Sequence, residues 1–314
     1  MLLDREKLVV IIGPTAVGKT KLSIDLAHRM NGEIISGDSM QIYKGMNVGT
    51  AKIRKDEMEN IPHHLIDIKN PNEDFSVAEF QETVRPLINN ITSRNKMPMI
   101  VGGTGLYIQS VLYDYQFTES PSNPVFREKM YKLLEEKGEK VLHEQLVLID
   151  PVSAKNIHPN NSRRVIRALE VYECTKKPMS EYINDQEKHL LYDVALIGLS
   201  MDRDVLYDRI NHRVDIMVEQ GVLTEAKELF DKGLRDSQAA KAIGYKEFFD
   251  YLDGSCTLDE VILQLKQNSR RYAKRQLTWF RNKMEVKWFD MTPPIHHEQK
   301  VDEIFSYIAG KLEL

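Results

Sequence analysis

The segment Gly13–Thr20 combines residue types and a spacing that suit the binding of phosphate groups. It reads GPTAVGKT and fits the phosphate-loop pattern G-x-x-x-x-G-K-[ST] at every position. The glycines let backbone N–H groups turn inward, and the start of the following helix adds the positive end of a dipole. Lys19 supplies a full positive charge, and the Thr20 hydroxyl is suited to hold a Mg²⁺ ion. We therefore expect a ligand with two or more phosphates rather than a tight turn that binds nothing. The expected cradle consists of Gly13, Pro14, Thr15, Ala16, Val17, Gly18, Lys19 and Thr20.

Two arginines, Arg209 and Arg213, suit the same ligand. They stand four residues apart in a long predicted helix, Leu206–Phe230, so both guanidinium groups lie on one of its faces. The helix follows a predicted strand, and a planar guanidinium binds an oxyanion through two parallel hydrogen bonds. The alternative is an ordinary salt-bridged helix, in which Asp208 and Asp215 neutralise the arginines.

A carboxylate and a second glycine-rich turn fall at the ends of two further predicted strands. Asp38 directly follows one strand, and the sequence Gly-Gly-Thr-Gly at 102–105 follows the next. Open α/β folds place their chemistry at this carboxyl edge of the sheet. Thr104 and its neighbours are therefore expected to approach a ligand with their backbone. Asp38 has an alternative role as a helix N-cap, with Gln41 as its capping-box partner.

A basic stretch near the C-terminus indicates a polyanionic partner. The segment Gln264–Lys283 contains no acidic residue, and on a helix its charges form one stripe with aromatic side chains beside it. That combination favours a nucleic-acid backbone over a solvated helix face. The expected contacts are Arg270, Arg271, Lys274 and Arg275. A second group, Arg163, Arg164 and Arg167, begins another predicted helix and either contacts a partner or is a solvated face tied to Glu170.

The elements that must position these groups are predicted from hydrophobic periodicity. Strands are expected at Leu8–Ile12, Glu33–Ser36, Pro98–Val101, Val194–Leu199 and Glu285–Asp290. Helices are expected at Lys21–Met30, Ser76–Asn90, Leu106–Tyr113 and Val301–Leu312. The glycine-punctuated segment Tyr43–Lys52 is predicted to be a loop over the site rather than part of the core. The fold class is therefore α/β, with a P-loop parallel-sheet core, helices on both faces and an inserted all-helical domain.

The insertion is indicated by a change of composition at residues 120–124, Ser-Pro-Ser-Asn-Pro, which is typical of a linker. From there to about Tyr192, helical patterns replace strand-like runs. The predicted helices are Phe126–Lys137, Lys140–Ile149, Ser153–Ile157, Arg163–Cys174 and Met179–Ile183. The expected domains are a catalytic core of residues 1–117 and 193–314, and a helical insertion of residues 118–192.

The composition is that of a soluble protein, with 42% apolar and 29% charged residues over 314 positions. A net charge of −4 argues against a uniformly basic nucleic-acid coat. Cys174 and Cys256 lack metal-type spacing and are expected to be reduced thiols. The N-terminal apolar run is too short for a signal peptide or a membrane span. We therefore expect a cytoplasmic protein without a membrane partner. A monomer is expected as well, although none of these observations bears on it.

The residues alone leave several classes of protein open. A P-loop kinase of small molecules fits, although the third strand ends in glycines where a Walker-B aspartate is expected, and Asp67 could replace it. A nucleotide-dependent RNA-binding switch needs a guanine-reading Asn-Lys-x-Asp motif, which the sequence lacks. His63 and His64 are adjacent, but no third ligand follows at metal spacing, so a structural role is expected.

Six segments together resemble the bacterial tRNA dimethylallyltransferases, the isopentenyl-diphosphate:tRNA transferase family. They are Gly13–Thr20, Gly37–Lys52, Val101–Tyr107, Arg163–Val171, Leu206–Gly221 and Ala242–Glu247. The resemblance implies that the phosphate loop, with Mg²⁺, holds the diphosphate of dimethylallyl diphosphate instead of ATP. It also implies that the acceptor is the exocyclic amine of the adenosine just 3′ of the tRNA anticodon.

The resemblance further assigns roles to residues that match the family's motifs. Asp38 is similar to the general base that accepts a proton from the amine, and Thr104 falls with it in the catalytic site. The positions that match contacts to the tRNA anticodon stem-loop are Asp38, Ser39, Met40, Gln41, Thr104, Arg127, Ser162, Arg163, Arg164, Val165 and Ile166. The target base is stacked in the anticodon loop and must flip out to reach the site. The enzyme's main contribution to catalysis would be electrostatic, because the charge of the departing diphosphate must be neutralised. The groups expected to do this are Lys19, Thr20 with Mg²⁺, and Arg209 or Arg213.

Overall fold

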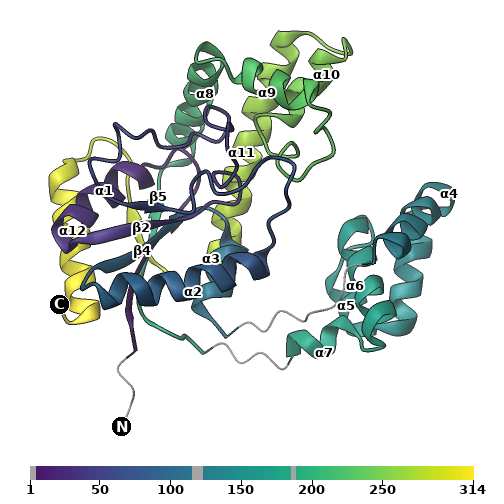
Figure 1. The fold of residues 1–314 in the computed structure, drawn as a ribbon, viewed down its shortest axis with the longest axis horizontal. Helices are drawn as coiled ribbons and strands as arrows, with labels where there is room; N and C mark the ends of the chain where they lie inside the picture. The colour runs from purple at the N-terminus through teal and green to yellow at the C-terminus, as the bar shows by residue number, and fades with distance from the viewer. Residues whose placement is uncertain (1–4, 115–122, 185–188) are drawn as a thin grey trace. The chain divides into compact units, whose positions relative to one another are not determined.

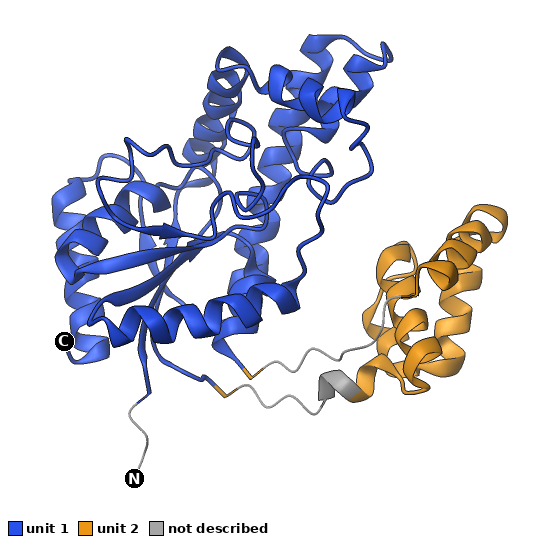
Figure 2. Cartoon of the chain, in the orientation of Figure 1, with its two compact units in different colours: residues 1–113, 190–314 blue, residues 114–189 orange. Residues whose placement is uncertain are grey.

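The computed structural model describes residues 5–114, 123–184 and 189–314. The chain divides into two compact units, one of residues 1–113 and 190–314 and one of residues 114–189 (Figure 2). The predicted boundary between residues 117 and 118, and the linker residues 120–122, lie outside the described residues.

The first unit is built on a parallel sheet, as the strand pattern predicts. The strands within the described residues are β1 (Lys7–Ile12), β2 (Gly32–Gly37), β3 (His63–His64), β4 (Met97–Gly102), β5 (Asp193–Ser200) and β6 (Lys287–Asp290). Their order is β3-β2-β4-β1-β5-β6, and every neighbouring pair is parallel. The short edge strand β3 was not predicted, because two histidines carry no hydrophobic pattern. The fold class is confirmed as α/β.

Strand β1 explains why the sheet is covered on both faces. Its side chains alternate, so that Leu8, Val10 and Ile12 enter one hydrophobic cluster while Val9 and Ile11 enter another. A continuous apolar run is typical of a parallel strand buried on both sides. Such a strand has no solvated face, and helices must cover it on both.

The helices of this unit fall on the two faces accordingly (Figure 1). Residues of α1 (Lys19–Met30) and α12 (His297–Leu312) join the cluster of Val9, and residues of α2 (Val77–Ser93) and α3 (Gly105–Leu112) join that of Leu8. The remaining helices are α8 (Arg203–Glu219), α9 (Val222–Asp231), α10 (Lys246–Leu252) and α11 (Leu258–Lys283). Helix α11 contributes to both clusters, through Phe280 and Ala273 respectively.

Two sequence predictions for this unit are wrong in part. The expected single helix Leu206–Phe230 is broken into α8 and α9, because Gly221 adopts a φ of 92° that ends the first helix. The segment Tyr43–Lys52 was expected to lie over the site and outside the core. It has neither helix nor strand, but Tyr43 and Met46 are fully buried in the core.

The second unit is all-helical in its described part. Its helices are α4 (Pro124–Ile149), α5 (Pro151–Asn156), α6 (Ser162–Thr175) and α7 (Met179–Asn184). Gly138, with a φ of 77°, kinks α4 between the two helices predicted there. Leu142 and Leu146 pack on Val165 and Ile166 to form a separate small core.

The first unit is interrupted where α3 ends and resumes at residue 190. The Leu191 N–H donates to the Leu112 carbonyl at 2.9 Å, and Tyr113 and Leu190 form an antiparallel bridge. The two chain segments that flank the interruption, at residues 112–113 and 190–191, therefore lie side by side. None of the described helices is long and apolar enough to cross a membrane.

Candidate active site

The phosphate loop connects the end of β1 to the start of α1 and adopts a conformation that only glycine allows at two positions. Gly13 and Gly18 have φ values of 154° and 105°. A Cβ on Gly13 would also lie 2.8 Å from the Leu199 carbonyl oxygen. Lys19 lies over this loop, and its Nζ donates to the Gly13 and Pro14 carbonyls at 2.9 and 2.8 Å.

The electrostatics of the loop favour an anion. Burial, with a further contribution from Arg213, lowers the pKa of Lys19 to about 8, and Asp38 opposes that shift. Burial and Arg209 likewise lower the pKa of Arg213. A depressed pKa in a cationic group means that its charged form is poorly compensated in this site. An anion bound here would supply that compensation.

Arg209 and Arg213, both on α8, reach the loop. Arg209 Nε donates to the Ala16 carbonyl at 3.0 Å, and Arg213 Nη1 donates to Thr15 Oγ1 at 3.3 Å. In the part of the chain that the structure describes, neither arginine pairs with a carboxylate, and Asp215 pairs with Lys266 instead. The salt-bridged alternative is therefore not observed.

Asp38 and Thr104 lie beside each other at the ends of β2 and β4. Asp38 Oδ1 accepts the Met40 N–H at 2.8 Å, while residues 38–41 begin no helix, so the helix-cap alternative is wrong. Thr104 Oγ1 accepts the Ser39 N–H at 3.1 Å, and the Thr104 N–H donates to the Gly37 carbonyl at 3.1 Å. The bond from the Met40 N–H to Asp38 forms an Asx turn, which occupies one carboxylate oxygen of Asp38 and fixes the orientation of its side chain.

Gln276 on α11 joins the two glycine loops and was not predicted as a site residue. Its Oε1 accepts the Thr15 N–H and its Nε2 donates to the Gly103 carbonyl, both at 3.0 Å. A Cβ on Gly103 would lie 2.1 Å from that Nε2, and one on Gly105 would lie 2.2 Å from the Trp279 ring. These glycines therefore allow α11 to pack closely against the turn. The sequence predicts only that they let the backbone approach a ligand.

Tyr272, also on α11, is a second residue that the sequence did not single out for the site. Burial and the charge of Asp38 raise its pKa well above the ordinary value, although hydrogen bonding from Thr104 and Gln276 opposes this. The phenol therefore stays protonated at neutral pH. The Arg275 guanidinium lies 5.8 Å from the ring centroid. The only signal in the sequence was an aromatic residue within the basic run.

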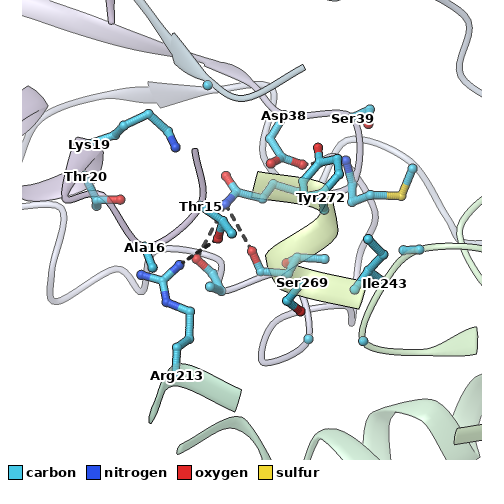
Figure 3. A pocket seen from close by; sticks show the side chains of 18 of the residues that line it. Thr15, Ala16, Lys19, Thr20, Asp38, Ser39, Arg213, Ile243, Ser269 and Tyr272 are labelled. Carbon is cyan, nitrogen blue, oxygen red and sulfur yellow. Dashed lines mark hydrogen bonds between the residues drawn. The ribbon is translucent and has the colours of Figure 1, made fainter. Parts of the chain in front are cut away.

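One pocket of about 460 Å³ connects these groups. Figure 3 shows Lys19, Asp38 and Tyr272 around it, contributed by the phosphate loop and α1, the end of β2, and α11. Residues expected at the site that line it are Thr15, Ala16, Gly18, Lys19, Thr20, Asp38, Ser39, Met40, Gln41, Arg213 and Arg275. Apolar side chains, among them Val214, Met217 and Leu265, also line it. The pocket thus reaches from the phosphate loop to Asp38 without interruption.

The remaining expected RNA contacts have different surroundings. On α11, Arg271 and Lys274 are exposed, while Arg270 donates to the Asn211 side chain at 2.5 Å. In the second unit, Arg163 and Arg164 are exposed at the start of α6.

Other expected contacts in the second unit have partners within it. Val165 and Ile166 are buried in its core. Arg127 and Arg167 both pair with the buried Glu170, at 2.8 and 2.7 Å. For Arg167 the alternative of a tie to Glu170 is therefore correct.

No cluster of protein ligands for a metal ion is found in the part of the chain that the structure describes. Asp67, considered as a replacement for the Walker-B aspartate, pairs with Lys52 at 2.6 Å and does not line the pocket. His64 pairs with Glu33, and His63 bonds to the Ile61 carbonyl. Within the described ranges no three His, Cys, Asp or Glu side chains gather around a metal position. Thr20 is exposed at the pocket, which fits a Mg²⁺ ion held mostly by phosphate oxygens and water.

The chain is similar to proteins of one family over nearly its whole length. A family model described as IPP transferase matches residues 41–283. The tRNA dimethylallyltransferase of Geobacillus thermodenitrificans is 63% identical over 309 residues, which are 98% of each chain. That of Bacillus subtilis is 61% identical over 310 residues, which are 99% of each.

Solved structures agree with these similarities. The full-length tRNA isopentenylpyrophosphate transferase from Bacillus halodurans has a TM-score of 0.75 at 55% identity, over 98% of this chain and 97% of that one. A eukaryotic dimethylallyltransferase, solved as snapshots of its action on tRNA, has a TM-score of 0.80 at 33% identity, over 95% of this chain and 77% of that one. The resemblance seen in the motifs is confirmed: the chain belongs to the IPP transferase family.

Proposed function

We propose that this protein transfers the dimethylallyl group from dimethylallyl diphosphate to the N6 amine of the adenosine 3′-adjacent to the anticodon in tRNA. Two of the relatives reported above are named tRNA dimethylallyltransferases. In this chain, the observation that carries the proposal is the single pocket that joins a phosphate loop to Asp38. A donor diphosphate at one end and an acceptor amine at the other would meet inside it.

The donor end would bind and neutralise the diphosphate. Lys19, Arg213 and the loop N–H groups supply positive charge, and Arg209 holds the loop through the Ala16 carbonyl. The allylic C–O bond breaks as the C–N bond forms, and diphosphate leaves with the electron pair of the broken bond. The charge that develops on diphosphate is stabilised by groups already in place. Mg²⁺, held by Thr20 and the phosphate oxygens, would supply further charge neutralisation.

The acceptor end would position the amine and take its proton. Asp38 has one oxygen committed to the Met40 N–H, which leaves the other for the adenosine amine. The proton released from nitrogen passes to that carboxylate as the new bond forms. Thr104 supports the arrangement, because its hydroxyl oxygen fixes the backbone at Ser39.

The RNA would be bound by groups on both units. Ser39, Met40 and Gln41 line the pocket next to Asp38, and they would contact a flipped nucleotide. The exposed charges of α11 suit phosphates of the anticodon stem-loop. In the second unit, the contacts would come from Arg127 and from the first turn of α6, Ser162–Ile166. Val165 and Ile166 are buried there, so their part would be limited to the backbone.

The test is transfer of radiolabel from dimethylallyl diphosphate to an unmodified anticodon stem-loop RNA. The label is expected in RNA with Mg²⁺ present, and it should be absent when the target adenosine is replaced by guanosine. Hydrolysis of ATP by the protein, unaffected by dimethylallyl diphosphate and without label in RNA, would instead support the kinase alternative.

A further inference from the structure

The Glu225 side chain, on α9, lies outside the site described above and accepts several hydrogen bonds. Its Oε1 accepts the Asn47 and Val48 N–H groups at 3.0 and 2.9 Å. Its Oε2 accepts the Val48 and Gly49 N–H groups at 2.9 and 3.2 Å. Three successive backbone donors therefore converge on one carboxylate, which fixes the conformation of residues 47–49.

Tyr245 completes this arrangement from the N-terminus of α10. Its hydroxyl donates to Glu225 Oε2 at 2.8 Å. Burial and the charge of Glu225 strongly raise the pKa of Tyr245, so the hydroxyl remains a donor. The ring packs on Gly49, where a Cβ would lie 2.5 Å from it. Gly244, with a φ of 101°, lies against the Gly49 carbonyl.

The segment that Glu225 holds continues directly into the pocket wall. Gly49, Thr50 and Ala51 line the pocket, as do Ala242–Gly244, which directly precede Tyr245. The turn is closed by its own bonds, from the Ala51 N–H to the Val48 carbonyl and from the Lys52 N–H to the Asn47 carbonyl.

This wall also supports a residue placed at the acceptor end. Gln41 Nε2 donates to the Thr50 and Ala51 carbonyls at 3.4 and 3.5 Å. Its Oε1 accepts the Ser36 hydroxyl at 3.2 Å, two residues before Asp38. A connected set of hydrogen bonds therefore leads from α9 to the neighbourhood of the proposed general base.

From these contacts we infer that Glu225 is a positioning residue for the RNA acceptor, acting through the wall formed by residues 47–51. The inference rests on the proposed function, because it concerns the end of the pocket assigned to RNA. Without the carboxylate the wall must be ordered by the incoming nucleotide, and this ordering weakens RNA binding. The phosphate loop makes no contact with Glu225, so binding of the diphosphate should not change.

The direct test is Glu225→Gln, which keeps the shape of the side chain. It replaces one carboxylate oxygen by an NH₂ group, which cannot accept the hydrogen bonds that the backbone and Tyr245 donate. We expect the KM for the stem-loop RNA to rise about 10-fold, within the range for an unpaired buried polar group. The KM for dimethylallyl diphosphate should stay within about 2-fold, because the diphosphate binds at the other end of the pocket. The kcat should also stay within about 2-fold, because the wall is already ordered once the RNA is bound. Tyr245→Phe removes one of the donors and should raise the RNA KM in the same direction by a smaller factor.

Glu228→Gln is the matched control, because Glu228 is an exposed carboxylate on the same helix and forms a long ion pair with Lys232, at 3.9 Å. A merely structural Glu225 would lower the melting temperature and the fraction of active enzyme while leaving both KM values unchanged. That result would overturn the inference.

Amide hydrogen exchange at residues 47–49 gives a readout that needs no substrate. Exchange there should accelerate in Glu225→Gln and in Tyr245→Phe, but not in Glu228→Gln. Unchanged exchange would also overturn the inference. If the wild-type enzyme labels no RNA but the two variants alter exchange as expected, the proposed function is refuted, while the ordering of residues 47–49 by Glu225 and Tyr245 still holds.

Discussion

Replacement of Gln276 tests whether α11 holds the two glycine loops together. Gln276 is 6% exposed, and it satisfies the Thr15 N–H and the Gly103 carbonyl at once. Leucine has a similar size but no polar atom, so both backbone groups would lose their partner. Each buried polar group left unpaired costs about 1–3 kcal/mol, and Gln276→Leu should therefore lower the free energy of unfolding by about 2–6 kcal/mol.

Gln276→Glu separates the two hydrogen bonds. The introduced carboxylate still accepts the Thr15 N–H, but its other oxygen faces the Gly103 carbonyl without a proton between them. The expected loss is about 1–3 kcal/mol at neutral pH. It should shrink at acid pH, because the protonated carboxyl regains a donor. Gln276→Leu has no such recovery.

The measurement is urea unfolding followed by tryptophan fluorescence. The sequence has two tryptophans, and both Trp279 and Trp288 lie in the α/β unit, so the signal reports that unit alone. Gln267→Leu, at an exposed position of the same helix, is the control. If Gln276→Leu is as stable as Gln267→Leu, the two hydrogen bonds do not hold the loops together and the reasoning is refuted.

Three further predictions concern the proposed reaction. Asp38→Asn keeps an acceptor for the Met40 N–H but loses the base, so single-turnover transfer should slow about 100-fold or more while RNA affinity changes little. A near-normal rate would remove Asp38 from the chemistry. Lys19, with a pKa of about 8, is charged below that pH and neutral above it, so diphosphate affinity measured by calorimetry should fall as the pH rises through about 8. Lys19→Arg should abolish that pH dependence; the same fall in the variant would contradict the assignment. Arg271→Ala and Lys274→Ala should each lower the slope of log RNA affinity against log salt by about 0.7 to 0.9, and an unchanged slope in both would exclude α11 from the RNA interface.

Features encoded within a short stretch of chain were predictable from the sequence. The loop Gly13–Thr20 and its flanking strand and helix are specified by neighbouring residues, because glycine conformation and hydrophobic periodicity are local properties. The same holds for the face shared by Arg209 and Arg213, since four residues make about one helical turn. These patterns sufficed for the α/β fold and for one end of the pocket.

Features that depend on contacts between distant segments were not predictable. Gln276 and Tyr272 gain their surroundings only when α11 packs against the loops at the end of the sheet. Gln276, for example, lies 261 residues beyond its partner Thr15. Tyr43 and Met46 lie in a segment with the composition of a surface loop, yet tertiary packing buries them. The break at Gly221 falls within an otherwise continuous helical pattern, and a single glycine is often tolerated inside a helix at about 1 kcal/mol.

The pairing of Leu112 with Leu191 has a consequence for how this architecture varies between relatives. The two chain segments that flank the interruption are bonded to each other, so the geometry of the sheet does not depend on what lies between them. The entropy of closing such a loop grows only with the logarithm of its length, and doubling the length costs about 0.6 kcal/mol. Evolution can therefore lengthen, shorten or reshape the segment between these two residues at little cost to the catalytic core. If the second unit contacts RNA as proposed, changes in those contacts are in this way separated from changes in the chemistry.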